Sequence, residues 1–129
     1  MKLEDITSFE EKHKYLEENL QDDMYVRTSD NGIDKFKFKF KLKNDGNPFY
    51  IYYFEKTSMT NPERYIVKEP SHNIIDLIEE GDYVNGWKIL HWTDGTKIVD
   101  DGWATDLDKM DIKSIVTKEQ MEAMEYKIV

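Results

Sequence analysis

Lysine and apolar residues alternate strictly over residues 35–43, where lysine takes the odd positions and phenylalanine or leucine the even ones. A helix would mix the two sets on its surface, so the alternation predicts a β-strand with an apolar face and a lysine face. Asp45-Gly46 is a strong hairpin signal, and the aromatic-rich residues 49–55 predict the return strand. We therefore expect a β-hairpin in the middle of the chain.

A hairpin turn centred on Asp45-Gly46 fixes which residues lie opposite each other. On the face that we expect to be buried, the pairs are Leu42–Phe49, Phe40–Ile51 and Phe38–Tyr53. On the other face, the pairs are Lys41–Tyr50, Lys39–Tyr52 and Lys37–Phe54. A shift by one residue would set lysines against the apolar side chains, so the sequence favours this register.

Helical periodicity precedes the hairpin. One face of a helix over residues 8–21 would carry Phe9, His13, Leu16 and Leu20. Ser8 and Glu11 have the spacing of a capping box at its start. Residues 24–28 predict a short strand, because the turn signal Asp30-Asn31-Gly32 follows them. The N-terminal third therefore predicts a helix that packs on a sheet.

Short strands and tight turns dominate the rest of the chain. Asn85-Gly86 and Asp94-Gly95 are hairpin signals. Thr117 and Gln120 have capping-box spacing for a short helix through Ala123. The strands expected here are 64–68, 83–84, 87–92, 112–116 and 126–129, with a short helical segment over 73–80.

These elements predict an α+β fold of mostly antiparallel strands, with an N-terminal helix and a small SH3-like or strongly bent C-terminal sheet. A chain of 129 residues is the usual size of one domain. Residues 70–73 are too few to form an interdomain linker. We expect one domain, with the helix and hairpin in 1–70 and a β-rich module in 71–129.

Charge is segregated along the chain, which carries a net charge of −9. Residues 1–34 hold 4 basic and 10 acidic side chains, residues 35–68 hold 8 and 3, and residues 69–129 hold 6 and 14. The overall acidity opposes general affinity for DNA and favours a partner with a basic surface. Solubility alone is the other explanation for a charge of this size.

Several classes of site lack support in the sequence. Cysteine is absent, which excludes disulfides, thiolate zinc sites and cysteine nucleophiles. His13, His72 and His91 lack metal-ligand spacing, and there is no glycine-rich phosphate loop or nucleophile elbow. We expect no enzyme, cofactor or metal. Without a long apolar run or a signal-peptide core, we expect a cytoplasmic protein that does not enter a membrane.

The lysine face of the hairpin is the first candidate binding surface. Lys37, Lys39 and Lys41 would lie beside Tyr50 and Tyr52. Cations next to flat rings suit an acidic protein surface, or single-stranded nucleic acid held by phosphate contacts and base stacking. An ordinary solvated sheet face gives the same pattern. A further alternative is that the acidic N-terminal helix packs across this face.

Carboxylates form the second candidate surface, for which we select Glu79, Glu80, Asp100 and Asp101. The region 100–111 lacks the EF-hand pattern, which favours a solvated acidic loop over a calcium site. Such carboxylates also resemble a row of phosphates, so acidic mimicry of nucleic acid is an alternative. Trp87, Trp92 and Trp103 are expected in the core or against the sheet; one exposed beside acids would anchor an interface.

Residues 72–86, HNIIDLIEEGDYVNG, and residues 112–120, IKSIVTKEQ, resemble segments of short uncharacterised proteins of phages and prophages of low-GC, Gram-positive bacteria. The resemblance is confined to residues 72–129. It implies a mobile-element origin and a small β-rich module, and it supplies neither an activity nor site residues. Small acidic phage proteins include inhibitors of host defence such as anti-CRISPR proteins, which is an analogy of class.

Three hypotheses about function follow. The first is a phage-encoded, non-enzymatic binding protein that inhibits a host defence protein by occupying its surface, with acidic mimicry as one means. The second is a single-stranded nucleic-acid-binding module that uses the lysine and tyrosine face. The third is a small phage structural or assembly protein that forms a defined homo-oligomer.

Overall fold

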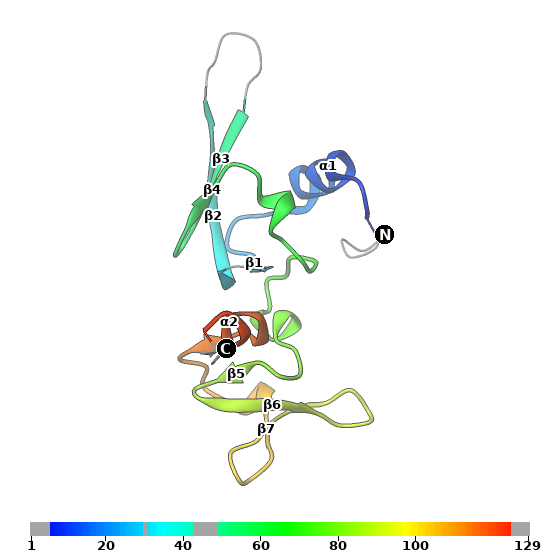
Figure 1. Ribbon diagram of the computed structural model, residues 1–129, viewed down its shortest axis with the longest axis vertical. Helices are drawn as coiled ribbons and strands as arrows, with labels where there is room; N and C mark the ends of the chain where they lie inside the picture. The colour runs from blue at the N-terminus through cyan, green and yellow to red at the C-terminus, as the bar shows by residue number, and fades with distance from the viewer. Residues whose placement is uncertain (1–5, 30, 43–48, 125–129) are drawn as a thin grey trace, which may run out of the picture.

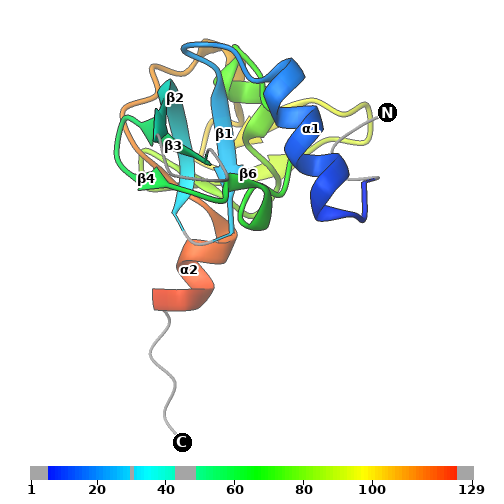
Figure 2. The same cartoon turned by 90° about the horizontal axis from the view of Figure 1, so that it is seen from above.

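The computed structural model describes residues 6–29, 31–42 and 49–124, and it confirms the α+β class. Helix α1, Phe9–Asn19, lies on one side of a four-stranded antiparallel sheet (Figures 1 and 2). The strand order of this first sheet is β1-β2-β3-β4. Its strands are β1 (Tyr25–Thr28), β2 (Gly32–Leu42), β3 (Phe49–Phe54) and β4 (Ser58–Met59).

A five-stranded antiparallel sheet follows, with the order β8-β7-β6-β5-β9. Its strands are β5 (Tyr83–Val84), β6 (Trp87–His91), β7 (Lys97–Val99), β8 (Thr105–Asp106) and β9 (Ile115–Val116). The short helices are η2 (Pro62–Arg64), η3 (Ile74–Leu77), η4 (Leu107–Lys109) and α2 (Lys118–Met124). No helix in the described part of the chain is long and apolar enough to cross a membrane.

The predicted hairpin register is confirmed over most of its length. Residues of β2 and β3 pair as Phe38–Tyr53, Lys39–Tyr52, Phe40–Ile51, Lys41–Tyr50 and Leu42–Phe49. The register shifts between Phe36 and Phe38, so Phe54 pairs with Phe36 and the predicted pair Lys37–Phe54 is wrong. This β-bulge turns Phe36 onto the face opposite that of Phe38. The turn residues 43–48 lie outside the described residues.

The face of the hairpin that we expected to be buried is also wrong. Phe38 and Phe40 are each 54% exposed, whereas Tyr52 is only 1% exposed. The reason is tertiary: α1 and the segment around Ile66 pack on the Tyr52 side of the sheet. The core there consists of Leu16, Val26, Phe36, Tyr52, Phe54 and Ile66. The alternative in which the N-terminal helix packs across the lysine and tyrosine face is therefore confirmed at Tyr52, which shares a buried cluster with Leu16 of α1.

Aliphatic residues form the core on the buried side of the second sheet. Its buried cluster is Ile33, Leu77, Ile78, Val84, Ile89, Val99 and Leu107. Ile33 belongs to β2, so the first sheet contributes to this core as well. Bridges from Tyr25 to Ser71 and from Thr28 to Ile66 tie the connecting segment to β1.

Local signals predicted several turns and caps correctly. Asn85 and Gly86 have φ angles of 53° and 85°, as a type I′ turn between β5 and β6 requires. The amide of Thr117 donates to Gln120 at 3.0 Å, and the amide of Gln120 donates to the Thr117 hydroxyl at 3.2 Å. The predicted capping box of α2 is therefore made.

Other local predictions are wrong. Residues 64–68 do not form a strand, because η2 takes up Arg64 and only Ile66 bridges to β1. Ser8 does stand at the N-cap of α1, but its side chain makes no capping hydrogen bond. Strands β9, Ile115–Val116, and β6, Trp87–His91, are shorter than predicted. The strand expected at 126–129 lies outside the described residues.

Candidate functional site

The three tryptophans are exposed, which contradicts the expectation that they lie in the core. Trp87, Trp92 and Trp103 are 48%, 55% and 86% exposed, and Leu90 is 37% exposed. They come from β6, the residue after it and the loop between β7 and β8, all at the end of the molecule farthest from the hairpin (Figure 1). We call these four exposed side chains, Trp87, Leu90, Trp92 and Trp103, the tryptophan surface; within β6, Trp87 lies on the same side as Ile89 and Leu90 on the other.

A hydrogen-bonded turn holds the Trp103 side chain in solvent. The Asp101 carboxylate accepts hydrogen bonds from the Trp103 amide at 2.9 Å and from the Thr105 hydroxyl at 2.8 Å. Gly102 and Ala104, on either side of Trp103, have φ angles of 90° and 52°. A left-handed conformation is costly for alanine, so the surrounding contacts must impose it. The exposure of Trp103 thus belongs to an organised loop.

Ionised carboxylates accompany the tryptophans. The hydrogen bonds from the Trp103 amide and the Thr105 hydroxyl lower the pKa of Asp101, and hydrogen bonds from Thr96 lower the pKa of Asp94. Both side chains therefore stay negative near neutral pH. Residues 100–111 contain five aspartates and one lysine: Asp100, Asp101, Asp106, Asp108, Asp111 and Lys109. The exposed indoles therefore lie at an end of the molecule where aspartates outnumber lysines, since residues 87–111 hold six aspartates against Lys88, Lys97 and Lys109.

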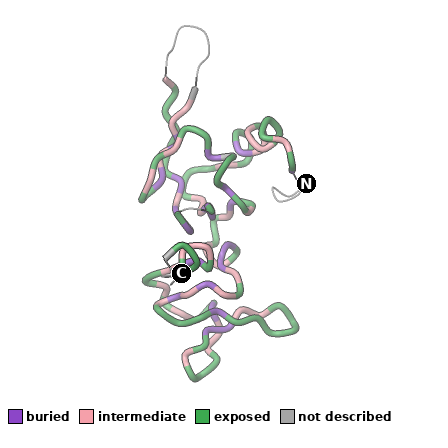
Figure 3. Tube along the Cα trace, viewed as in Figure 1, coloured by how far each residue is buried: buried purple, intermediate pink, exposed green. Residues whose placement is uncertain are grey.

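A second exposed aromatic face lies on the hairpin, beyond the reach of α1. Phe38 stacks on Tyr53 with ring centroids 4.7 Å apart and an interplanar angle of 18°. Phe40 pairs with Ile51 on the same face. We call Phe38, Phe40, Ile51 and Tyr53 the aromatic ribbon face. Figure 3 shows that the projecting part of the hairpin and the β6–β7 end consist mainly of exposed and intermediate residues.

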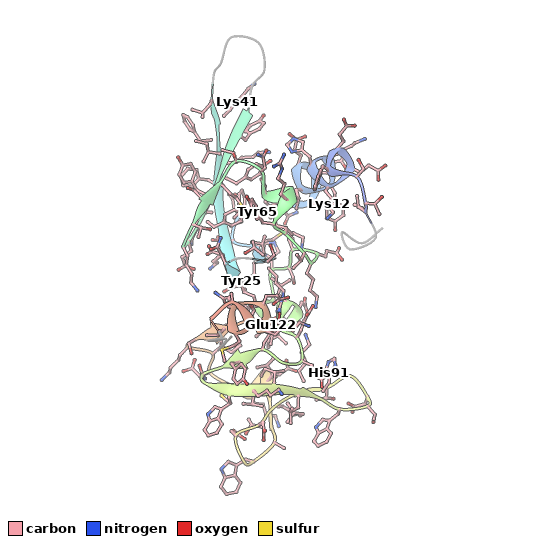
Figure 4. All side chains as sticks on the ribbon, in the orientation of Figure 1. Lys12, Tyr25, Lys41, Tyr65, His91 and Glu122 are labelled. Carbon is pink, nitrogen blue, oxygen red and sulfur yellow. The ribbon has the colours of Figure 1, made fainter. Side chains whose placement is uncertain are left out.

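The candidate lysines lie on the other side of the same two strands. Lys37 is 3.5 Å from Asp23, and both side chains are exposed. The Lys39 ammonium lies 5.0 Å from the centroid of the Tyr50 ring, as predicted for a cation beside an aromatic. Lys41 lies near the projecting end of the hairpin (Figure 4). Tyr52, the remaining candidate of this surface, is buried and therefore inaccessible to a partner.

A buried charge network joins the two sheets, and sequence reasoning missed it. Arg27 of β1 is fully buried. Its Nη1 donates to Asp82 at 2.6 Å and to the Leu77 carbonyl at 2.9 Å, while its Nη2 donates to Asp82 at 2.8 Å and to Glu119 of α2 at 2.6 Å. Burial disfavours the charge of Arg27, but the bonds to Asp82 and Glu119 outweigh that cost and raise its pKa.

Glu79 belongs to this network and not to an open surface. It lies 2.9 Å from Lys118, 3.3 Å from Lys68 and 3.8 Å from Arg27. Burial opposes its charge, but the hydrogen bond from Lys118 and the charge of Arg27 dominate and lower its pKa. Glu80 beside it is exposed. The one sequence signal for the network is a single charged residue, Arg27, within the strand predicted at 24–28.

Eight of the nine candidate residues separate into three groups, and the ninth, Glu80, is exposed beside Glu79. Lys37, Lys39, Lys41 and Tyr50 lie on the hairpin, whereas Asp100 and Asp101 lie beside the tryptophan surface at the opposite end. Tyr52 and Glu79 have structural partners inside the fold. Among the described residues, no group of three or more His, Asp or Glu side chains could hold a metal ion.

No family model matches the chain, and comparisons with curated proteins and with solved structures likewise find no match. The inferences about function therefore depend on the geometry of the two surfaces and on the charges around them.

Proposed function

We propose that the protein is a non-enzymatic binding protein that acts by occupying a surface of another protein, and that the tryptophan surface makes the contact. The observation that carries the proposal is the exposure of Trp103, 86%, on an organised loop beside ionised aspartates. Tryptophan is among the residue types enriched at the few positions that carry most of the binding free energy of protein interfaces.

Energetics support a binding role for these side chains. Burying a large apolar side chain contributes roughly 1.5–3 kcal/mol to folding. The second sheet buries Val84, Ile89 and Val99 completely but leaves its tryptophans exposed, so their burial does not contribute to folding. A partner that covers the indoles would recover it as binding free energy.

The charges favour a partner with a basic surface. The charges of Asp94, Asp100 and Asp101 would steer such a surface toward the indoles. This attraction would weaken as the salt concentration rises, because salt screens the charges. The resemblance of residues 72–86 to phage and prophage proteins suggests that this partner is a host protein, with a defence protein as the first candidate. Binding would inhibit it by covering the surface that it uses.

The test is capture of host proteins on the immobilised wild-type chain and on matched variants. Trp92→Ala with Trp103→Ala, and separately Asp100→Lys, should each abolish capture of a specific partner. Phe9→Ala is the control, because Phe9 is 58% exposed but lies on α1. Capture that survives the tryptophan double variant, or that Phe9→Ala reduces equally, would contradict the proposal.

A further inference from the structure

We infer that one partner of the tryptophan surface is a second copy of this chain, which presents its aromatic ribbon face and hairpin lysines, so that copies associate head to tail. The inference rests on the proposed function in using the tryptophan surface as a protein-binding surface. It adds the identity of one occupant and assigns a role to the hairpin.

Charge complementarity between the two ends is the first argument. The described part of the hairpin beyond the bulge, residues 38–42 and 49–54, carries Lys39 and Lys41 and no carboxylate. The opposite end carries the aspartates of the 100–111 region. A chain with a net charge of −9 repels copies of itself on average, so charge favours an approach that brings the lysines of one copy toward the aspartates of another.

Exposed aromatic area at both ends is the second argument. Phe38 and Phe40 are as exposed as Trp92, so each end has large rings to bury. Lys39 and Lys41 lie on the other side of the same two strands, with the Lys39 ammonium 5.0 Å from the centroid of the Tyr50 ring, so they would attract the acidic end of a second copy through their longer-range field while the rings make the contact. Apolar contact would supply affinity, and the charges would fix the orientation.

Within one chain, the hairpin and the tryptophan surface are too far apart to contact each other. The hairpin projects at one end of the longest axis, and β6 and β7 form the other end (Figure 1). The labelled side chains of Lys41 and His91 lie near these opposite ends (Figure 4). The contact must therefore be intermolecular and heterologous, which builds an open chain of copies or closes into a ring.

The first measurement is sedimentation velocity of the wild-type chain over a wide concentration range at low salt. We expect species larger than a dimer, which dissociate as salt rises. Wild-type protein that stays monomeric throughout would overturn the inference.

Variants that block one end at a time make the test specific. Lys39→Glu with Lys41→Glu blocks the hairpin, and Asp100→Lys with Trp103→Ala blocks the tryptophan surface. Each variant alone should be monomeric. Their equimolar mixture should form a heterodimer and nothing larger, because only one functional pair of ends remains. Lys12→Glu with Lys14→Glu on α1 reverses the same charge elsewhere and should leave assembly intact.

Other outcomes identify other occupants and would overturn the inference. A symmetric dimer that only the hairpin variant abolishes would show that hairpins pack against each other. Monomers whose hairpin binds single-stranded oligonucleotides in a salt-sensitive manner would assign that face to nucleic acid.

Loss of self-association with intact tryptophan-dependent capture of a host protein refutes only the second-copy partner. Capture that does not depend on the tryptophans refutes the proposed function itself.

Discussion

The two sheets use their large side chains in opposite ways. The first sheet buries Phe36, Tyr52 and Phe54 against α1 and exposes Phe38 and Phe40 beyond it. The second sheet builds its core from small aliphatic residues such as Val84 and Ile89, and leaves its tryptophans outside. In this protein, therefore, a large aromatic side chain is not buried because it is large. It is buried only where a helix or another segment packs over it.

This difference separates stability from binding. Residues that hold the fold together lie near the junction of the sheets, where Arg27, Asp82 and Glu119 meet. The exposed rings lie at the two ends, where their replacement leaves the core intact. The following changes test this separation, from the largest expected effect to the smallest.

Arg27→Met should cost the most, about 3–5 kcal/mol of unfolding free energy, because it leaves the buried Asp82 without its counter-charge. Urea denaturation would measure the loss, and amide hydrogen exchange should show it in both sheets. The double variant Arg27→Met with Asp82→Leu should regain part of it, since the fully buried carboxylate is gone and the remaining partner, Glu119, is partly exposed to solvent. A near-neutral single variant would show that the network does not join the sheets.

Ile89→Ala compared with Trp103→Ala tests the roles of buried and exposed side chains in the second sheet. Ile89 is completely buried, so its truncation should cost about 2–5 kcal/mol, whereas the exposed Trp103 should change stability by less than about 0.5 kcal/mol. Thermal and urea unfolding would measure both. A Trp103→Ala variant as unstable as Ile89→Ala would mean that the indole supports the fold.

Thr117→Ala tests the attachment of α2, which brings Glu119 to Arg27. Loss of the capping box should cost about 1 kcal/mol and lower the helical signal in circular dichroism. Thr117→Ser keeps the hydroxyl and should restore most of the stability. Failure of the serine variant to do so would place the effect in lost packing.

Glu79→Gln should also have a small effect, below about 1 kcal/mol, because Glu79 is partly exposed and solvent screens its ion pairs. The folded state lowers the pKa of Glu79 below its ordinary value of 4.5. Its contribution is therefore present above that value and disappears as the pH falls through the lower, folded pKa. Glu79→Gln should flatten the acid limb of stability against pH, as measured by urea denaturation across the acid range.

Local signals determined much of the fold because their physics acts over a few residues. Asn85 and Gly86 tolerate positive φ angles, which makes a type I′ turn there almost independent of context. Thr117 and Gln120 satisfy each other's amides across one helical turn. The turn signal Asp45-Gly46 and the alternation over 35–43 together predicted the hairpin register beyond the bulge, because a shift by one residue would set lysines opposite apolar side chains.

The tertiary structure alone decided which faces are covered. The bulge at Lys37 turns Phe36 toward α1 and Phe38 away from it, and the position of α1 makes Tyr52 a core residue. Arg27 is satisfied only because Asp82 and Glu119, distant in sequence, fold around its strand. The tryptophans are exposed because the sheet that carries them packs its other residues inward. Hydrophobic periodicity and turn geometry depend on residues close in sequence, so the sequence predicts them. Burial depends on which distant elements pack against each face, so only the tertiary structure decides it.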